Sequence, residues 1–176
     1  MTNSFRAFII AVTLGCALAA IGSAEAARLD PGPGVYSFSG VSHLTGLGQD
    51  LRCTLTLTGS VELNSDGNVT VSVTRGDATG DFATGCSLVG FQFPWKATIL
   101  AAAIPANPSQ PIPMIFENVM VTAATRNCTD QPTTVTAQFS NEVPITEPST
   151  LRIDAEIGRC SVIGTFRAKT DVNLIR

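Results

Sequence analysis

The sequence contains few ionisable side chains, and this scarcity excludes several classes of function. Charged residues make up only 14% of its 176 residues, the formal net charge is −3, and the lysines and arginines stand singly. Because nucleic-acid binding requires clustered basic side chains that neutralise phosphates, we expect no nucleic-acid partner. Threonine, serine and asparagine supply much of the polarity instead. Such a weakly charged surface suits contact with hydrophobic surfaces or self-assembly.

Residue types that carry catalysis are equally scarce. His43 is the only histidine, and its hydroxyl neighbour Ser42 would point to the opposite face of a strand, where the two side chains cannot pair. The sequence also lacks GxSxG, HExxH and phosphate-binding glycine motifs. A single tryptophan and a single tyrosine make a thin platform for stacking sugars beside paired carboxylates. We therefore predict a non-enzymatic protein with no catalytic residues, no metal and no cofactor.

Long hydrophobic runs are missing except near the start. Residues 7–21 are almost uniformly apolar, follow a positively charged start and precede the small residues of 22–26. This layout predicts a signal peptide over 1–26. A membrane anchor is the alternative, but the run is shorter than the roughly 20 residues that a span needs. The mature chain, 27–176, is then expected to have no transmembrane span and to be secreted or on the outer cell surface, with the periplasm as the alternative.

Cysteine usage agrees with export. Removal of the signal peptide leaves Cys53, Cys86, Cys128 and Cys160. An even number of cysteines in an oxidising compartment predicts two disulfides. Zinc binding is the competing interpretation. It is disfavoured because no CxxC pair is present and His43 has no cysteine at ligand spacing.

Alternation of apolar and hydroxyl side chains dominates the mature chain. It is clearest in residues 54–63 and 69–74, which flank an Asn-Ser-Asp-Gly-Asn turn at 64–68. A period of two with β-branched residues predicts half-buried strands, and the Asp-Gly pair predicts a hairpin. Further strands are expected at 35–40, 96–101, 115–123, 133–140, 150–157 and 161–174, the last broken in two. The fold class is therefore all-β, as an antiparallel sandwich or a barrel-like sheet.

A proline-rich segment at 104–113 divides the mature chain. Proline lacks the N–H that a ladder needs, so this segment is not expected to form a central strand. We predict one β-sandwich domain over 27–176, with possible repeat halves at 35–103 and 114–176. Each half is near the lower size limit for an independent core, which favours a shared one.

The cysteines support a degenerate internal duplication. Cys53 and Cys128 are each followed by threonine, and Cys86 and Cys160 by serine. The spacing within each pair is 33 and 32 residues. If the halves are stapled alike, the disulfides are Cys53–Cys86 and Cys128–Cys160, each contributing roughly 3–4 kcal/mol on the chain-entropy model. A crossed pairing between the halves stays open.

One aromatic cluster follows the second of these cysteines. Phe91, Phe93, Pro94 and Trp95 place three large rings within five residues. The cluster has two interpretations: a core anchor that packs against a disulfide, or an apolar contact surface. We favour the core interpretation.

These motifs resemble those of a known family. Gly85-Cys86-Ser87 leads into Pro94-Trp95, and Cys128 and Cys160-Ser161 follow. In this order they are similar to the small secreted bacterial alkane-oxidation activators of the PraB type. The resemblance implies a secreted, non-catalytic, surface-associated protein that aids contact with hydrophobic substrates, or biofilm formation and adhesion.

Two other functions stay open. A periplasmic β-barrel could hold a small hydrophobic ligand in its interior. A pilus-type subunit could complete its sheet with a strand donated by a neighbour.

Overall fold

The all-β prediction is confirmed by the computed structural model, which describes residues 26–80 and 83–176. The predicted signal peptide lies outside the described residues except for Ala26. The strands are β1 (Arg28–Asp30), β2 (Gly34–Gly46), β3 (Gln49–Leu63), β4 (Val69–Thr79), β5 (Val89–Gln92), β6 (Trp95–Ile99), β7 (Ile112–Ala123), β8 (Arg126–Asn127), β9 (Thr133–Ser140), β10 (Thr150–Ile157), β11 (Cys160–Ala168) and β12 (Asn173–Ile175). A four-residue helix, α1 (Ala83–Cys86), and a 3-10 turn, η1 (Ala101–Ala103), interrupt them.

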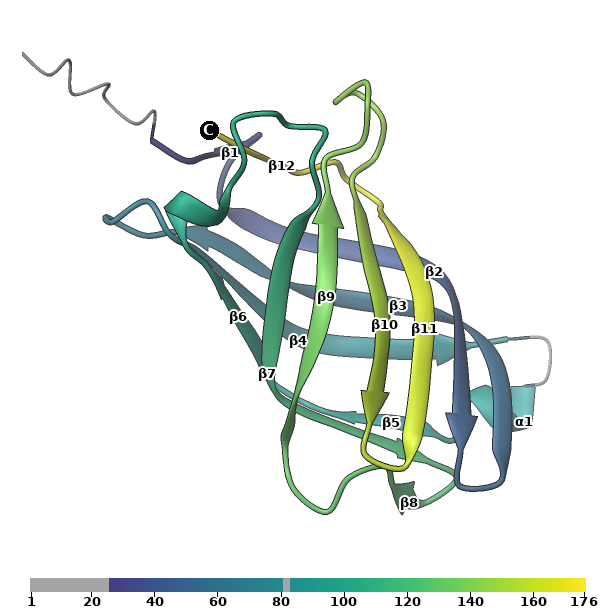
Figure 1. Cartoon of the computed structure of the whole chain (residues 1–176). Helices are drawn as coiled ribbons and strands as arrows, with labels where there is room; N and C mark the ends of the chain where they lie inside the picture. Colours follow the sequence, from purple (N-terminus) through teal and green to yellow (C-terminus); the bar gives the residue numbers. More distant parts are fainter. Residues whose placement is uncertain (1–25, 81–82) are drawn as a thin grey trace, which may run out of the picture.

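Eight of the strands form a closed antiparallel barrel (Figure 1). Their order is β7-β6-β4-β3-β2-β11-β10-β9, and a further pairing between β7 and β9 closes the ring. The predicted fold class allowed a sandwich or a barrel, and this pairing decides for the barrel in place of the β-sandwich predicted for 27–176. β5 and β8 pair with the far end of β7, and β1 and β12 form a separate two-stranded ribbon at the opposite end of the barrel (Figure 1).

The strand pattern of the sequence explains the barrel wall. In β9, Val135, Ala137 and Phe139 are buried while the intervening residues are exposed. β10 and β11 alternate in the same way. Because successive side chains on a strand point to opposite faces, one apolar set fills the interior and one polar set faces solvent. Phe116 and Phe166 are the largest of the fully buried side chains among the described residues.

The predicted strand positions are largely confirmed. β9 and β10 have the predicted bounds, and the last predicted strand is broken into β11 and β12. The expectation for the proline-rich segment 104–113 is wrong at its end, because β7 begins at Ile112 and Pro113 lies opposite Gln138 of β9. Pro113 is tolerated there because β6 pairs with β7 only at Glu117, so at Pro113 the strand has a partner on one side only and a missing N–H on the other side breaks no ladder bond.

Both disulfides form as the spacing predicted. Cys53 of β3 is bonded to Cys86 at the end of α1, and Cys128 is bonded to Cys160 at the start of β11. All four cysteines are buried. The two bridges occupy different local settings, a strand and a helix in one case and a loop and a strand in the other. The internal duplication itself stays a prediction.

Candidate functional site

The barrel interior contains two small apolar cavities. The first, of about 40 Å³, is lined by side chains such as Phe38 and Met114 and is covered by Leu174 of the β1–β12 ribbon. The second, of about 30 Å³, lies towards the other end and is lined by Trp95 and other apolar residues. Phe116 lines both cavities. The interior therefore offers space for apolar groups, and Phe116 divides that space.

Polar atoms that face this interior are already occupied. The Ser42 hydroxyl, at the second cavity, donates to the backbone oxygen of Cys53 at 3.2 Å. The Tyr36 hydroxyl, at the first, donates to the backbone oxygen of Gly32. Within 26–80 and 83–176, the residues that line the two cavities include no charged side chain. A charged or strongly polar ligand would therefore find no partner in either cavity.

The aromatic cluster closes the second cavity. Trp95 is 4% exposed and its indole N–H donates to the backbone oxygen of Gln92 at 2.7 Å. Phe93 and Trp95 have ring centroids 4.9 Å apart, and Phe91 packs edge-on against Trp95 at 5.8 Å. Phe91 and Phe93 are half-buried and Pro94 is exposed. The structure thus brings the three predicted rings together, with Phe91 and Trp95 on the cavity wall. Whether the cluster also binds a partner stays a prediction.

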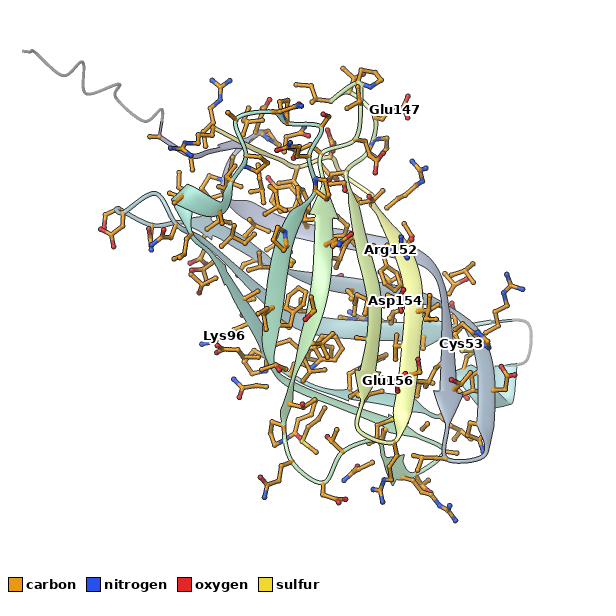
Figure 2. The ribbon with its side chains drawn as sticks, in the orientation of Figure 1. Cys53, Lys96, Glu147, Arg152, Asp154 and Glu156 are labelled. Atoms are coloured by element: carbon orange, nitrogen blue, oxygen red, sulfur yellow. A yellow bond between two sulfur atoms is a disulfide. The ribbon has the colours of Figure 1, made fainter. Side chains whose placement is uncertain are left out.

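At the opposite end of the barrel, an apolar tip is exposed. The loop between β9 and β10 projects from this end, as the position of Glu147 shows (Figure 2). Its residues Val143, Pro144 and Ile145 are exposed, Val143 to 67% and Ile145 to 39%. We call these three residues the apolar tip. The neighbouring segment 100–113 contains no charged residue, and its Leu100 is also exposed.

Hydrogen bonds hold the loop that carries the apolar tip. The Asn173 amide donates to the backbone oxygen of Ile145 at 3.3 Å. The Asp171 carboxylate accepts from that amide and from the backbone N–H groups of Ser149 and Val172 at 2.8–3.0 Å. A backbone bond across the turn, from Glu147 N–H to Pro144 oxygen, measures 2.9 Å. The exposed apolar side chains are therefore presented by an anchored loop.

Buried Asn141 joins this loop to two other segments. It is 1% exposed, and its amide donates to the backbone oxygens of Leu174 at 2.8 Å and Pro108 at 3.2 Å. Its side-chain oxygen accepts the Leu174 N–H at 2.8 Å. One asparagine thus fastens β12 and the proline-rich segment to the base of the tip loop.

The outer wall of the barrel is polar but carries few charges. Across β2 and β3, Ser37 pairs with Thr58 and Ser39 with Thr56 through hydroxyl hydrogen bonds of 2.7 and 2.8 Å. β10 displays a row of charges, Arg152, Asp154 and Glu156 (Figure 2). His43 is exposed and pairs with Asp50. Among the described residues no group of histidine, cysteine, aspartate or glutamate could hold a metal ion.

Tyr36 provides a test of the closure at the ribbon end. Burial raises the pKa of Tyr36 above its ordinary value of 10.0, and the Asp30 carboxylate adds to the rise. Because this pKa is higher in the folded than in the unfolded chain, protonated Tyr36 contributes to the free energy of unfolding. That contribution is fully present below pH 10.0 and is lost as the pH rises through the folded pKa.

Because Tyr36 is the only tyrosine, its tyrosinate absorbance can be followed without interference. We expect the native protein to titrate at a higher pH than the same chain in urea. The free energy of unfolding should fall over the same interval and stay flat in Tyr36→Phe. Coincident titration curves of the native and unfolded chains would contradict this assignment.

Comparison with known proteins supplies the family. A family model described as alkane oxidation protein activator PraA/PraB-like matches residues 1–176. The chain belongs to this family. No curated protein and no solved structure gives a significant match to this PraA/PraB-like protein. The description of the family as an activator fits a protein without a catalytic centre of its own.

The structure also indicates in which kind of cellular compartment the protein resides. Two disulfides indicate that the PraA/PraB-like protein resides in an oxidising environment outside the cytoplasm. In the part of the chain that the structure describes, no helix is long and apolar enough to cross a membrane.

Three features of the candidate sites were missed from the sequence. The apolar tip lies between two strands, and an apolar Val-Pro-Ile run in a connecting segment is a usable signal, because loops run over the surface. Asn141 and Phe116 gave no such signal. Their roles depend on partners far away in the sequence, at Leu174 for Asn141 and on several strands for Phe116.

Proposed function

We propose that this PraA/PraB-like protein acts as a secreted, non-catalytic, surface-associated protein that brings cells into contact with hydrophobic substrates. The observation that carries the proposal is the apolar tip: Val143, Pro144 and Ile145 are exposed together on an anchored loop. Exposed apolar patches mark sites of contact with apolar partners. The family description, which names the oxidation of alkanes, supports a hydrocarbon as the apolar phase.

Adsorption through the apolar tip follows from its composition. Moving the exposed surface of Val143 and Ile145 from water into hydrocarbon stabilises the adsorbed state by about 2 kcal/mol. The adjacent segment 100–113 adds no charge that would have to be desolvated. In the tip loop itself, Glu142 accepts a hydrogen bond from the Thr150 hydroxyl, and the exposed Glu147, which shares the turn with Pro144, has to keep its carboxylate in water. The tip can therefore enter an apolar phase while the polar wall of the barrel stays in water. Contact of this kind would also serve adhesion and biofilm formation on apolar surfaces.

Removal of the apolar tip should weaken adsorption. We expect the double variant Val143→Thr and Ile145→Thr to lower partitioning onto n-hexadecane droplets about tenfold, since 1.4 kcal/mol corresponds to a factor of ten. The measurement is the fraction of purified mature protein bound to emulsified n-hexadecane, at a series of droplet surface areas.

A matched control is available on the barrel wall. Val41 of β2 and Ile163 of β11 are exposed to 53% and 49%, and both lie away from the tip. The double variant Val41→Thr and Ile163→Thr removes a similar amount of apolar surface. It should partition like the wild type. Equal losses in the two double variants would refute tip-first contact and favour non-specific adsorption through the wall.

The pilus-type alternative receives less support. Each of the eight barrel strands pairs with two neighbours, so within the described residues the strands with a partner on one side only are the short β1, β5, β8 and β12. Strand donation requires an unpaired strand edge.

A further inference from the structure

We propose that the barrel interior is a second, separate binding site, which holds a slender unbranched hydrocarbon chain after Phe116 moves aside. The two cavities together extend along the barrel from Leu174 of β12 to Trp95 of β6. Phe116 lines both of them. This inference rests on the interior of the barrel and is independent of the apolar tip.

The size of the cavities requires a displacement. An apolar cavity of about 150 Å³ binds benzene, whereas these cavities measure about 40 and 30 Å³. Neither alone can hold a hydrocarbon. If the Phe116 ring moved out from between them, the two cavities and the volume that the ring now occupies would form one continuous space. The joined space would be long and narrow, which favours a linear chain over a ring.

The backbone beside Phe116 is irregular, which would ease that displacement. Phe116 pairs with Val135 of β9 and Val119 pairs with Thr133, so two residues of β7 face one residue of β9. This is a β-bulge, and its Asn118 has φ +61° in the left-handed region. Bulges leave a residue outside the ladder and redirect neighbouring side chains, often next to functional sites. Phe116, the residue between the two cavities, therefore lies immediately before an interruption of the β7–β9 ladder.

The lining selects the chemical class of the ligand. The hydroxyls of Tyr36 and Ser42 are engaged with backbone oxygens, and none of the described residues that line the cavities is charged. Burial of a carboxylate without a partner is strongly unfavourable. The site should therefore accept an alkane and reject a fatty-acid anion of the same length.

Trp95 permits a direct test, because it is the only tryptophan and lines the second cavity. Mature protein equilibrated with n-hexane should show a shift in Trp95 emission and an increase in Tm of about 2 °C or more, as expected for a ligand that binds only the folded state. Hexanoate at the same concentration should produce neither change. Cyclohexane should have a clearly smaller effect than n-hexane.

Two variants examine the site itself. Phe116→Leu places a smaller side chain between the two cavities, so a larger fraction of the protein is in the conformation that can bind. The variant should therefore bind n-hexane several-fold more strongly than the wild type. Val71→Leu fills part of the first cavity and should weaken binding. The tip variant Val143→Thr, Ile145→Thr should bind n-hexane like the wild type, which separates this site from the proposed function. The proposal is overturned if n-hexane leaves the wild type unchanged, or if its effect is the same in Phe116→Leu and Val71→Leu.

Discussion

Replacing Cys128 and Cys160 together by alanine is expected to lower the free energy of unfolding by about 4 kcal/mol. The bridge closes a loop of 32 residues. On the chain-entropy model, a cross-link of this span lowers the conformational entropy of the unfolded chain, and the loss of entropy corresponds to roughly this free energy. Both sulfurs are fully buried, so their loss also removes packing. The effect is large because small domains have only about 5–15 kcal/mol of net stability.

Urea denaturation measures this loss. The dependence of the free energy on urea should become steeper in the double variant, because an unfolded chain without the bridge exposes more surface. The double variant Cys53→Ala, Cys86→Ala should lose a similar amount, since its loop spans 33 residues. Reduction of the wild type should reproduce the sum of both losses. A change below about 1 kcal/mol for Cys128→Ala, Cys160→Ala would contradict the entropic account.

Local patterns were predictable because they depend on neighbouring residues. The hairpin between β3 and β4 follows from Asn64, whose side-chain oxygen accepts the N–H groups of Asp66 and Asn68 at 3.0 and 2.9 Å. Alternation fixed the inward and outward faces of β9 and β10. The cysteine pairing was predictable from matched spacing, a property of the sequence alone.

Closure of the barrel was not predictable in the same way. It depends on the pairing of β7 with β9, whose register no local pattern encodes. One signal was present in the strand glycines. A Cβ added at Gly40 would collide with the Thr165 backbone oxygen, and one at Gly59 with the Ser72 backbone oxygen. Glycines inside strands mark close approach of neighbouring backbones and sharp bends, which a curled sheet needs more than a flat sandwich does.

The candidate sites show the same division. The aromatic cluster is contiguous in sequence, so its three rings could be recognised before their packing was known. The two ends of the barrel assemble from distant segments instead. Val172 and Leu174 reach the cavity under the ribbon from the end of the chain, while Phe38 reaches it from β2. Contacts over such separations follow from topology, and the strand pattern alone does not specify them.

Replacing Asn141 by alanine should affect both stability and the apolar tip. The substitution leaves the N–H and the oxygen of Leu174 without partners in a buried setting, and it frees the Pro108 oxygen. Each buried group left unsatisfied costs about 1–3 kcal/mol, so we expect a loss of about 3 kcal/mol in the free energy of unfolding. The matched control is Asn107→Ala, an exposed asparagine whose hydrogen bonds stay within its own loop, and it should lose less than about 1 kcal/mol.

The Asn141→Ala variant also separates anchoring of the tip from its composition. The exposed side chains of Val143 and Ile145 are unchanged in it, but their loop loses its connection to β12 and to the proline-rich segment. Ordering that loop at a hydrocarbon surface would then cost conformational entropy that the wild type does not lose on adsorption. At a temperature where the variant is fully folded, its partitioning onto n-hexadecane should therefore fall below that of Asn107→Ala. Equal partitioning of the two variants would show that the composition of the tip suffices and that its anchoring contributes only to stability.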